Sequence, residues 1–234
     1  MSDDDELTEV DARLRIETSP WTTQDSFQTI KDPDHLLVRR VQEGKMDAFD
    51  ALVGKYKQPI VNFAARALGD AMEAQDVAQN AFLCVLKTSG RFRFACQFST
   101  WLYTIARNLC RNELRRRSRH RVDSLGSEHV ENLEFARWQG GASKLGSVPE
   151  AVFQRELQEK IEQALELLPE RERMAILLLR DEDLSYTDVA AVLGTSRAAT
   201  KTLIHRGRQT LKRELRPYLQ TGAWRKSWAK AFAQ

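Results

Sequence analysis

Basic side chains recur along residues 197–213 at spacings of three and four, so they would share one face of a helix. The stripe comprises Arg197, Lys201, His205, Arg208 and Lys212, flanked by Thr202, Arg206 and Arg213. A solvated surface is the alternative, but such helices usually alternate charge signs, and no Asp or Glu interrupts 197–213. A cationic helix face of this kind binds phosphate, and its first half can meet base edges in a DNA groove. His205 has no second metal ligand at ligand spacing, so we treat it as a contact residue.

Aromatic and basic residues alternate in a second segment, GRFRFACQ at residues 90–97. Aromatic rings on a basic loop stack unpaired bases, at roughly 1–3 kcal/mol per base. Core filling is the alternative for Phe92, Phe94 and Phe98. The helix expected after this loop would hold phosphates, which favours melted DNA as the ligand. The candidate contacts are Arg91, Phe92, Arg93, Phe94, Phe98, Trp101, Asn108, Arg111 and Arg115.

A third stripe is polar and lies on the helix expected after residue 70. Asp76, Gln79, Asn80 and Leu83 follow one another at i, i+3, i+4 and i+7, opposite the apolar face of that helix. Spacing alone leaves two interpretations open, a solvated surface and a docking face for a partner protein.

Helix start and stop signals place these stripes on an all-helical scaffold. Asp34 can cap a short helix, Gly69-Asp70 ends one helix and starts another, and Ser99 can cap the basic helix after the aromatic loop. No strand pattern is present.

A helix-turn-helix is predicted in the C-terminal part. Ser185 with Asp188 forms a weak capping box, Gly194 supplies a positive-φ stop, and Ser196 caps the cationic helix. Two short helices joined by a glycine-containing turn define this motif.

Composition bounds the remaining possibilities. The chain has 234 residues, 42% hydrophobic and 29% charged, with a net charge of only +3. No apolar run reaches the roughly 20 residues that span a bilayer, and the acidic start is no signal peptide. We therefore expect a cytoplasmic protein without stable membrane insertion. Cys84, Cys96 and Cys110 show no metal-site spacing, so we expect reduced, core-packed thiols, with redox sensing as the alternative, and no cofactor.

We expect two small helical domains joined by a flexible linker. The boundaries are an acidic extension at 1–33, a first helical block at 34–119, a linker at 120–149, a second block at 150–219 and a tail at 220–234.

Three strings, in order, resemble the extracytoplasmic-function (ECF) sigma factors of bacterial RNA polymerase. FSTWLYTIARN (98–108), followed by an arginine run, is the most specific; EAQDVAQNAF (73–82) and LPERERMAILL (168–178) accompany it. The resemblance implies that the first block is sigma region 2 and the second is sigma region 4. The chain departs from the family pattern at Ala198, Ala199 and Thr200, at Leu203 and at Gly207, which leaves the recognised sequence open.

The resemblance also implies a role for each stripe. The stripe at 76–83 would contact the clamp helices of the largest polymerase subunit, and region 4 would contact the flap of the second-largest. The aromatic loop and the helix after it would recognise and melt the minus-ten element of promoter DNA. The minus-thirty-five element would be contacted by Arg197, Lys201, Thr202, His205, Arg206 and Arg208. An anti-sigma factor joins the expected partners.

Two other classes of protein compete with this interpretation. A stand-alone helix-turn-helix regulator explains 185–215 but leaves FSTWLYTIARN unexplained. A nucleic-acid-processing enzyme needs clustered carboxylates or a His/Cys nucleophile beside a basic cleft, and the sequence shows neither. We therefore expect no enzymatic activity.

Overall fold

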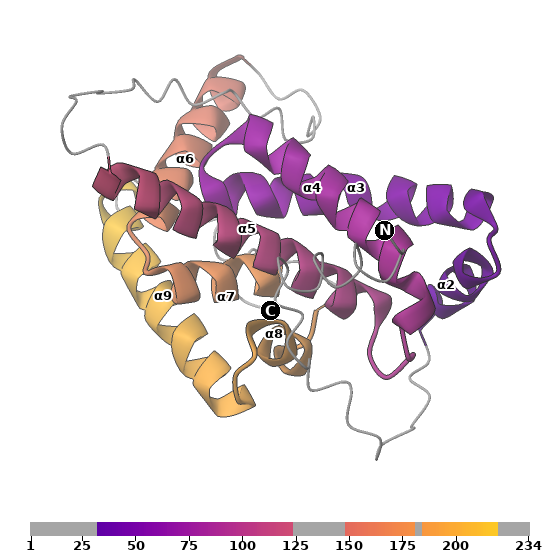
Figure 1. The fold of residues 1–234 in the computed structure, drawn as a ribbon. Helices are drawn as coiled ribbons and strands as arrows, with labels where there is room; N and C mark the ends of the chain where they lie inside the picture. Colours follow the sequence, from indigo (N-terminus) through magenta and orange to yellow (C-terminus); the bar gives the residue numbers. More distant parts are fainter. Residues whose placement is uncertain (1–31, 124–147, 181–183, 220–234) are drawn as a thin grey trace.

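The computed structural model describes residues 32–123, 148–180 and 184–219 (Figure 1). Its α-helices are α2 (His35–Gln42), α3 (Met46–Leu68), α4 (Ala71–Thr88), α5 (Phe98–Asp123), α6 (Val148–Glu166), α7 (Glu170–Arg180), α8 (Tyr186–Leu193) and α9 (Arg197–Leu219). A 3-10 turn, η2 (Ser89–Arg91), follows α4. These ranges contain no strand, which confirms the all-α fold. The predicted tail, most of the predicted extension and most of the predicted linker lie outside them.

Helices α2 to α5 form the first bundle, in which α3, α4 and α5 pack on one another. Gly69 ends α3 with a φ of +70°, a conformation that glycine adopts readily. Asp70 then starts α4, since its side chain accepts hydrogen bonds from the backbone nitrogens of Met72 and Glu73. The predicted boundary at Gly69-Asp70 is confirmed, and it fixes where the polar stripe of α4 begins.

Asp34 lies at the N-cap position of α2, as predicted, but does not cap the helix with its side chain, and the predicted cap at Ser99 is wrong. The Asp34 carboxylate instead accepts hydrogen bonds from Lys55 Nζ, at 2.7 Å, and from the Tyr56 hydroxyl. Because Asp34 is buried, these partners on α3 replace the solvent that the carboxylate has lost. Helix α5 begins at Phe98, so Ser99 is a buried residue of its first turn.

Helices α6 to α9 form the second bundle, and its helix-turn-helix is confirmed. Ser185 and Asp188 make a reciprocal capping box at the start of α8, and Gly194 ends α8 with a φ of +61°. The Ser196 hydroxyl accepts a hydrogen bond from the backbone nitrogen of Ala199, 3.1 Å away, at the start of α9. These local bonds fix the angle at which α9 leaves the turn.

Gly207 lies where α9 crosses α7. A Cβ at this position would lie 2.9 Å from Cγ1 and 3.3 Å from Cδ1 of Ile176. The close approach explains a glycine inside a helix, where it costs about 1 kcal/mol relative to alanine.

We predict that Gly207→Ala lowers the free energy of unfolding by roughly 1 kcal/mol, because overpacking exceeds the gain in helix propensity. Urea denaturation measures the change. In an Ile176→Ala background the same substitution should raise stability, since the clash is gone. A gain in stability in the wild-type background would contradict the packing argument.

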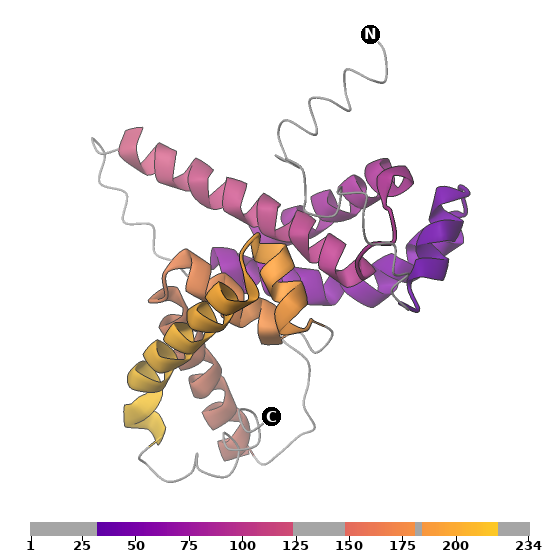
Figure 2. The same ribbon diagram turned by 90° about the horizontal axis from the view of Figure 1, so that it is seen from below.

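The two bundles are in contact. Helix α8 packs on α5 and α7 packs on α3. The hydroxyl of Thr100, a fully buried residue of α5, donates a hydrogen bond to Asp188 Oδ1 of α8 at 3.1 Å. Figure 2 shows α9 at the opposite end of the molecule from α2 and the loop beside it, as Figure 1 does.

All three cysteines are free and buried, as expected. Burial raises the pKa of both Cys96 and Cys110 to about 12. The thiolate is the reactive form, and at pH 8 a pKa of about 12 leaves roughly one thiol in ten thousand ionised.

We therefore predict that iodoacetamide at pH 8 leaves Cys96 and Cys110 unmodified in the folded protein. Both should be modified fully in urea, and intact-mass spectrometry distinguishes the two states. Rapid modification of either thiol without urea would contradict the burial.

Within the described ranges, no helix is both long and apolar enough to cross a lipid bilayer. No group of three or more His, Cys, Asp and Glu residues there could hold a metal ion.

Candidate nucleic-acid interface

Helix α9 presents the first candidate surface. Thr200, Ile204 and Gly207 lie on its buried side. The six predicted contacts, Arg197, Lys201, Thr202, His205, Arg206 and Arg208, are all exposed. No acidic side chain among the described residues forms an ion pair with any of the four Lys and Arg residues in this set. The positive charge of this face is therefore available to a polyanion.

The aromatic loop between η2 and α5 is mixed in character. Phe98 is 0% exposed and Phe92 6% exposed, and the Phe92 ring lies 4.9 Å from that of Trp101. The rings of Phe92 and Phe98 therefore fill the core, which was the alternative interpretation of these residues. The expectation that these two rings contact DNA directly is corrected. Phe94 is half-buried. In the sequence it follows the exposed Arg91 and Arg93 and precedes the buried Cys96.

Phe94 has a φ of +56°, a left-handed conformation that is uncommon for a bulky residue. Its ring makes edge contacts with the rings of Phe92, at 5.1 Å, and His35, at 5.2 Å. Among the predicted aromatic contacts, Phe94 and the half-buried Trp101 are the ones with surface left to offer a base.

Helix α5 carries the predicted cationic face, but its arginines are not equivalent. Arg115 is exposed, whereas Trp101, Asn108 and Arg111 are half-buried. Arg107 donates a hydrogen bond to Asn108 Oδ1 at 3.1 Å. Burial, and then the positive charge of Arg111, lower the pKa of Arg107. Such crowding of like charge is relieved when an anion binds.

Arg116 and Arg117 instead form ion pairs with Glu73 of α4. Arg117 donates to the carbonyl oxygen of Leu68, at 2.8 Å, and to the Glu73 carboxylate. Arg116 donates to both carboxylate oxygens of Glu113, and this bond lowers the pKa of Glu113. The run of arginines visible in the sequence thus divides into residues that fix α5 against α4 and residues that remain for a ligand.

The polar stripe of α4 is exposed along its whole length. Asp76, Gln79 and Asn80 are exposed, and Leu83 keeps 46% of its surface. Met72, one turn before Asp76, is 78% exposed and extends the stripe, although sequence reasoning missed it. Its i−4 spacing from Asp76 was the available signal.

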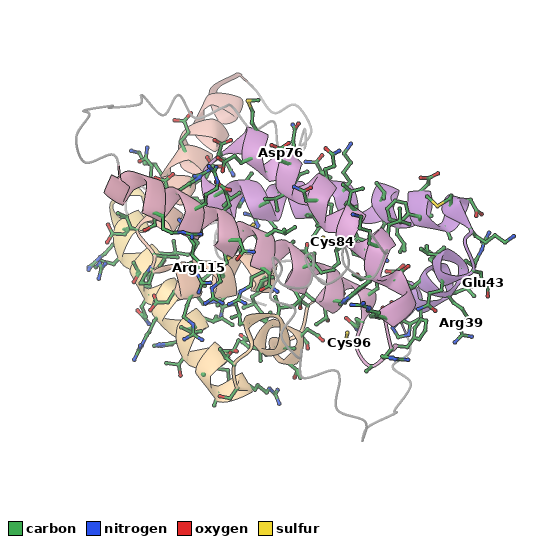
Figure 3. The ribbon with its side chains drawn as sticks, in the orientation of Figure 1. Arg39, Glu43, Asp76, Cys84, Cys96 and Arg115 are labelled. Atoms are coloured by element: carbon green, nitrogen blue, oxygen red, sulfur yellow. The ribbon has the colours of Figure 1, made fainter. Side chains whose placement is uncertain are left out.

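An open groove of about 1080 Å³ lies between α4 and α5. Glu73, Asp76 and Asn80 line its α4 wall, and Arg115, Arg116 and Arg119 line the other. Figure 3 labels Asp76 on α4 and Arg115 on α5. The candidate protein-docking stripe and the candidate DNA face therefore meet in one groove, whose α5 wall carries Glu113 beside its arginines.

Two family models match the chain. Sigma-70 region 2 matches residues 52–120, and sigma-70 region 4 matches residues 158–211. The first range contains the aromatic loop and the stripe of α4, and the second contains the helix-turn-helix.

Curated relatives match over most of their length. The RNA polymerase sigma-H factor of Pseudomonas aeruginosa is 37% identical over 190 residues, covering 81% of this chain and 97% of the relative. The ECF sigma factor SigW of Bacillus subtilis is 34% identical, and the match covers 76% of this chain and 95% of the relative. The ECF sigma-E factor of Escherichia coli is 33% identical, and the match covers 80% of this chain and 96% of the relative. The chain belongs to the ECF sigma factor family.

Solved structures agree with the fold of this sigma factor. CnrH, solved with the cytosolic domain of CnrY, superposes with a TM-score of 0.55 at 23% identity, covering 79% of this chain and 97% of its own. RpoE of Bartonella quintana, solved with the anti-sigma factor NepR, superposes with a TM-score of 0.58 at 24% identity. The superposition covers 72% of this chain and 96% of the RpoE chain.

Proposed function

We propose that this sigma factor binds core RNA polymerase through the α4 stripe and directs it to promoters with two DNA surfaces of different kinds. Helix α9 contacts base edges and phosphates of the minus-thirty-five duplex. The aromatic loop, through Phe94, and the cationic face of α5 hold the opened minus-ten strand. The polymerase carries out the chemistry.

The observation that carries this proposal is the contrast between the two surfaces. The six predicted contacts of α9 are all exposed and none of them is acidic, as expected for contact with the phosphates and base edges of a closed duplex. The loop offers the half-buried Phe94 directly after the exposed Arg91 and Arg93, as expected for a site that holds a base out of the stack. A stand-alone helix-turn-helix regulator needs only the first surface.

An anti-sigma factor stays among the proposed partners, because the family resemblance implies one. The α4–α5 groove, with both charge signs on its walls, is a surface that such a protein can cover in competition with polymerase.

Reconstituted transcription tests the proposed function. Core RNA polymerase and this protein are incubated with a library of duplexes that carry a randomised upstream region, and the run-off transcripts are sequenced. We expect defined start sites downstream of a recurrent pair of elements, which core polymerase alone does not produce. Tight duplex binding by the protein alone, with no defined start when polymerase is added, would instead show a stand-alone regulator.

A further inference from the structure

Helix α2 lies before both ranges that the family models match, and none of the predicted site residues belongs to it. Its side chains nevertheless contact the aromatic loop at several points. In Figure 1 the loop that precedes α5 lies beside α2, at the end of the molecule away from α9.

Hydrogen bonds from α2 and the residues before it hold both ends of the loop. Gln42 Nε2 donates to the carbonyl oxygens of Ser89, at 2.8 Å, and Phe92, at 3.2 Å. At the other end, Asp32 Oδ2 accepts a hydrogen bond from the backbone nitrogen of Phe98 at 2.6 Å. Backbone groups that would otherwise bind water are thereby fixed in place.

His35 holds the middle of the loop. Its Nε2 lies 2.9 Å from the carbonyl oxygen of Cys96. A carbonyl oxygen can only accept, so this Nε2 carries a proton and donates. The imidazole also makes edge contacts with Phe92, at 5.8 Å between ring centroids, and with Phe94, at 5.2 Å. The left-handed conformation of Phe94 therefore persists because its surroundings impose it.

Arg39, one turn after His35, completes the arrangement. The centre of its guanidinium lies 5.4 Å from the centroid of the Phe94 ring, within the range of a cation–π contact. Arg39 is exposed and forms no ion pair with another described residue. Its neighbour Arg40 differs, because it pairs with Asp47 at 2.5 Å. Figure 3 labels Arg39 beside α2, near the aromatic loop.

We propose that α2 is part of the surface that holds the opened DNA strand. Arg39, placed over Phe94, contacts the phosphate next to the unstacked base, and His35 is a positioning residue that keeps the loop in its binding conformation. A planar guanidinium suits this place because it can stack on the ring and donate to a phosphate at once. The inference rests on the proposed function, since it assigns new residues to the same minus-ten site.

The test uses holoenzyme assembled from core polymerase and the full-length protein. Its template is a promoter from the library selection, prepared fully paired and with mismatched, already open minus-ten bases. Affinity is measured over a range of salt concentrations, and core-polymerase retention and thermal unfolding are measured for every variant.

For Arg39→Leu we expect roughly tenfold weaker binding to the already open template, as for loss of one hydrogen bond to a charged group. The slope of log affinity against log salt should fall in magnitude by about 0.7, the loss of one single-strand phosphate contact. Arg40→Leu removes the same charge from the same helix and should leave both quantities unchanged. Equal behaviour of the two variants would overturn the assignment of Arg39.

For His35→Leu we expect weaker binding that His35→Gln restores, since the Gln amide can still donate to the Cys96 carbonyl. If His35→Gln binds as poorly as His35→Leu, the positioning role is wrong. Should His35→Leu fail to fold, the Arg39 and Arg40 pair still decides the inference.

The Phe94→Ala variant distinguishes a failure of the inference about α2 from a failure of the proposed minus-ten site. If Phe94→Ala weakens binding to the open template while the α2 variants do not, the inference about α2 is wrong and the proposed function stands. If Phe94→Ala also binds normally, the proposed minus-ten site is wrong and the inference falls with it.

Discussion

Replacing both Lys201 and Arg206 with alanine is expected to weaken holoenzyme binding to the upstream duplex by tenfold to several hundredfold. Both side chains are exposed on the acid-free face of α9. A lost base contact weakens binding by about 1–3 kcal/mol, and each lost phosphate contact lowers the magnitude of the salt slope by about 0.9. Fluorescence anisotropy with a labelled upstream duplex, over a range of salt concentrations, measures both effects.

Arg213→Ala is the matched control for this prediction. Arg213 is an exposed cation of the same helix, but it bonds to Glu214 at 2.8 Å, so part of its charge is neutralised within the protein. We expect a small change in affinity for this variant. Retention of core polymerase should be unaffected by the Lys201 and Arg206 substitutions; an equal loss of polymerase and duplex binding would contradict the assignment of α9.

Replacing Asp76 and Gln79 with alanine is expected to reduce retention of core polymerase at least tenfold while the fold stays intact. Both side chains are exposed on α4, on one stripe with Asn80 and Leu83. Truncating charged or polar groups at an interface leaves their partners unpaired, which weakens binding by about 2–5 kcal/mol when the pair is buried. A pull-down with tagged core polymerase at matched concentrations measures retention.

Asp50→Ala with Gln58→Ala provides the control, because the same two side-chain types are exposed on α3 instead of α4. This pair should leave retention unchanged. Normal retention by the Asp76 and Gln79 variant would show that the stripe is ordinary solvated surface, the other interpretation that its spacing allowed.

Local sequence signals predicted the helix-turn-helix well. The capping box at Ser185, the left-handed Gly194 and the Ser196 cap involve residues within a few positions of one another, so their chemistry is readable from the chain. The two faces of α9 follow from helix periodicity alone. Gly207 looked like a departure with a cost to the helix, and its reason, the nearby Ile176, emerged only from tertiary packing.

Predictions failed where a distant residue decides the outcome. Asp34 has a capping side chain, but Lys55 and Tyr56, more than twenty positions away, take its carboxylate. Phe92 and Phe98 lie in a segment whose local sequence is typical of a base-stacking loop. They are buried because their rings pack against Trp101 and the hydrophobic core, which the local sequence does not reveal.

Two further features of the site were hidden for the same reason. The arginine run of α5 reads as one cationic cluster, yet Arg117 is held by the Leu68 carbonyl and Glu73 of neighbouring elements. Helix α2 carries no motif at all, and its contact with the aromatic loop joins residues about 60 positions apart, as in the bond from His35 to Cys96.

We predict that this sigma factor opens promoter DNA only together with polymerase, through a loop distinct from the helix that contacts duplex. Permanganate oxidation of unstacked thymines on a linear promoter fragment tests it most directly. We predict reactive thymines in the minus-ten region with holoenzyme, none with this protein or core polymerase alone, and loss of the signal with Phe94→Ala. Holoenzyme that binds the fragment without any reactive thymine, or thymines equally reactive with the Phe94 variant, would contradict the account.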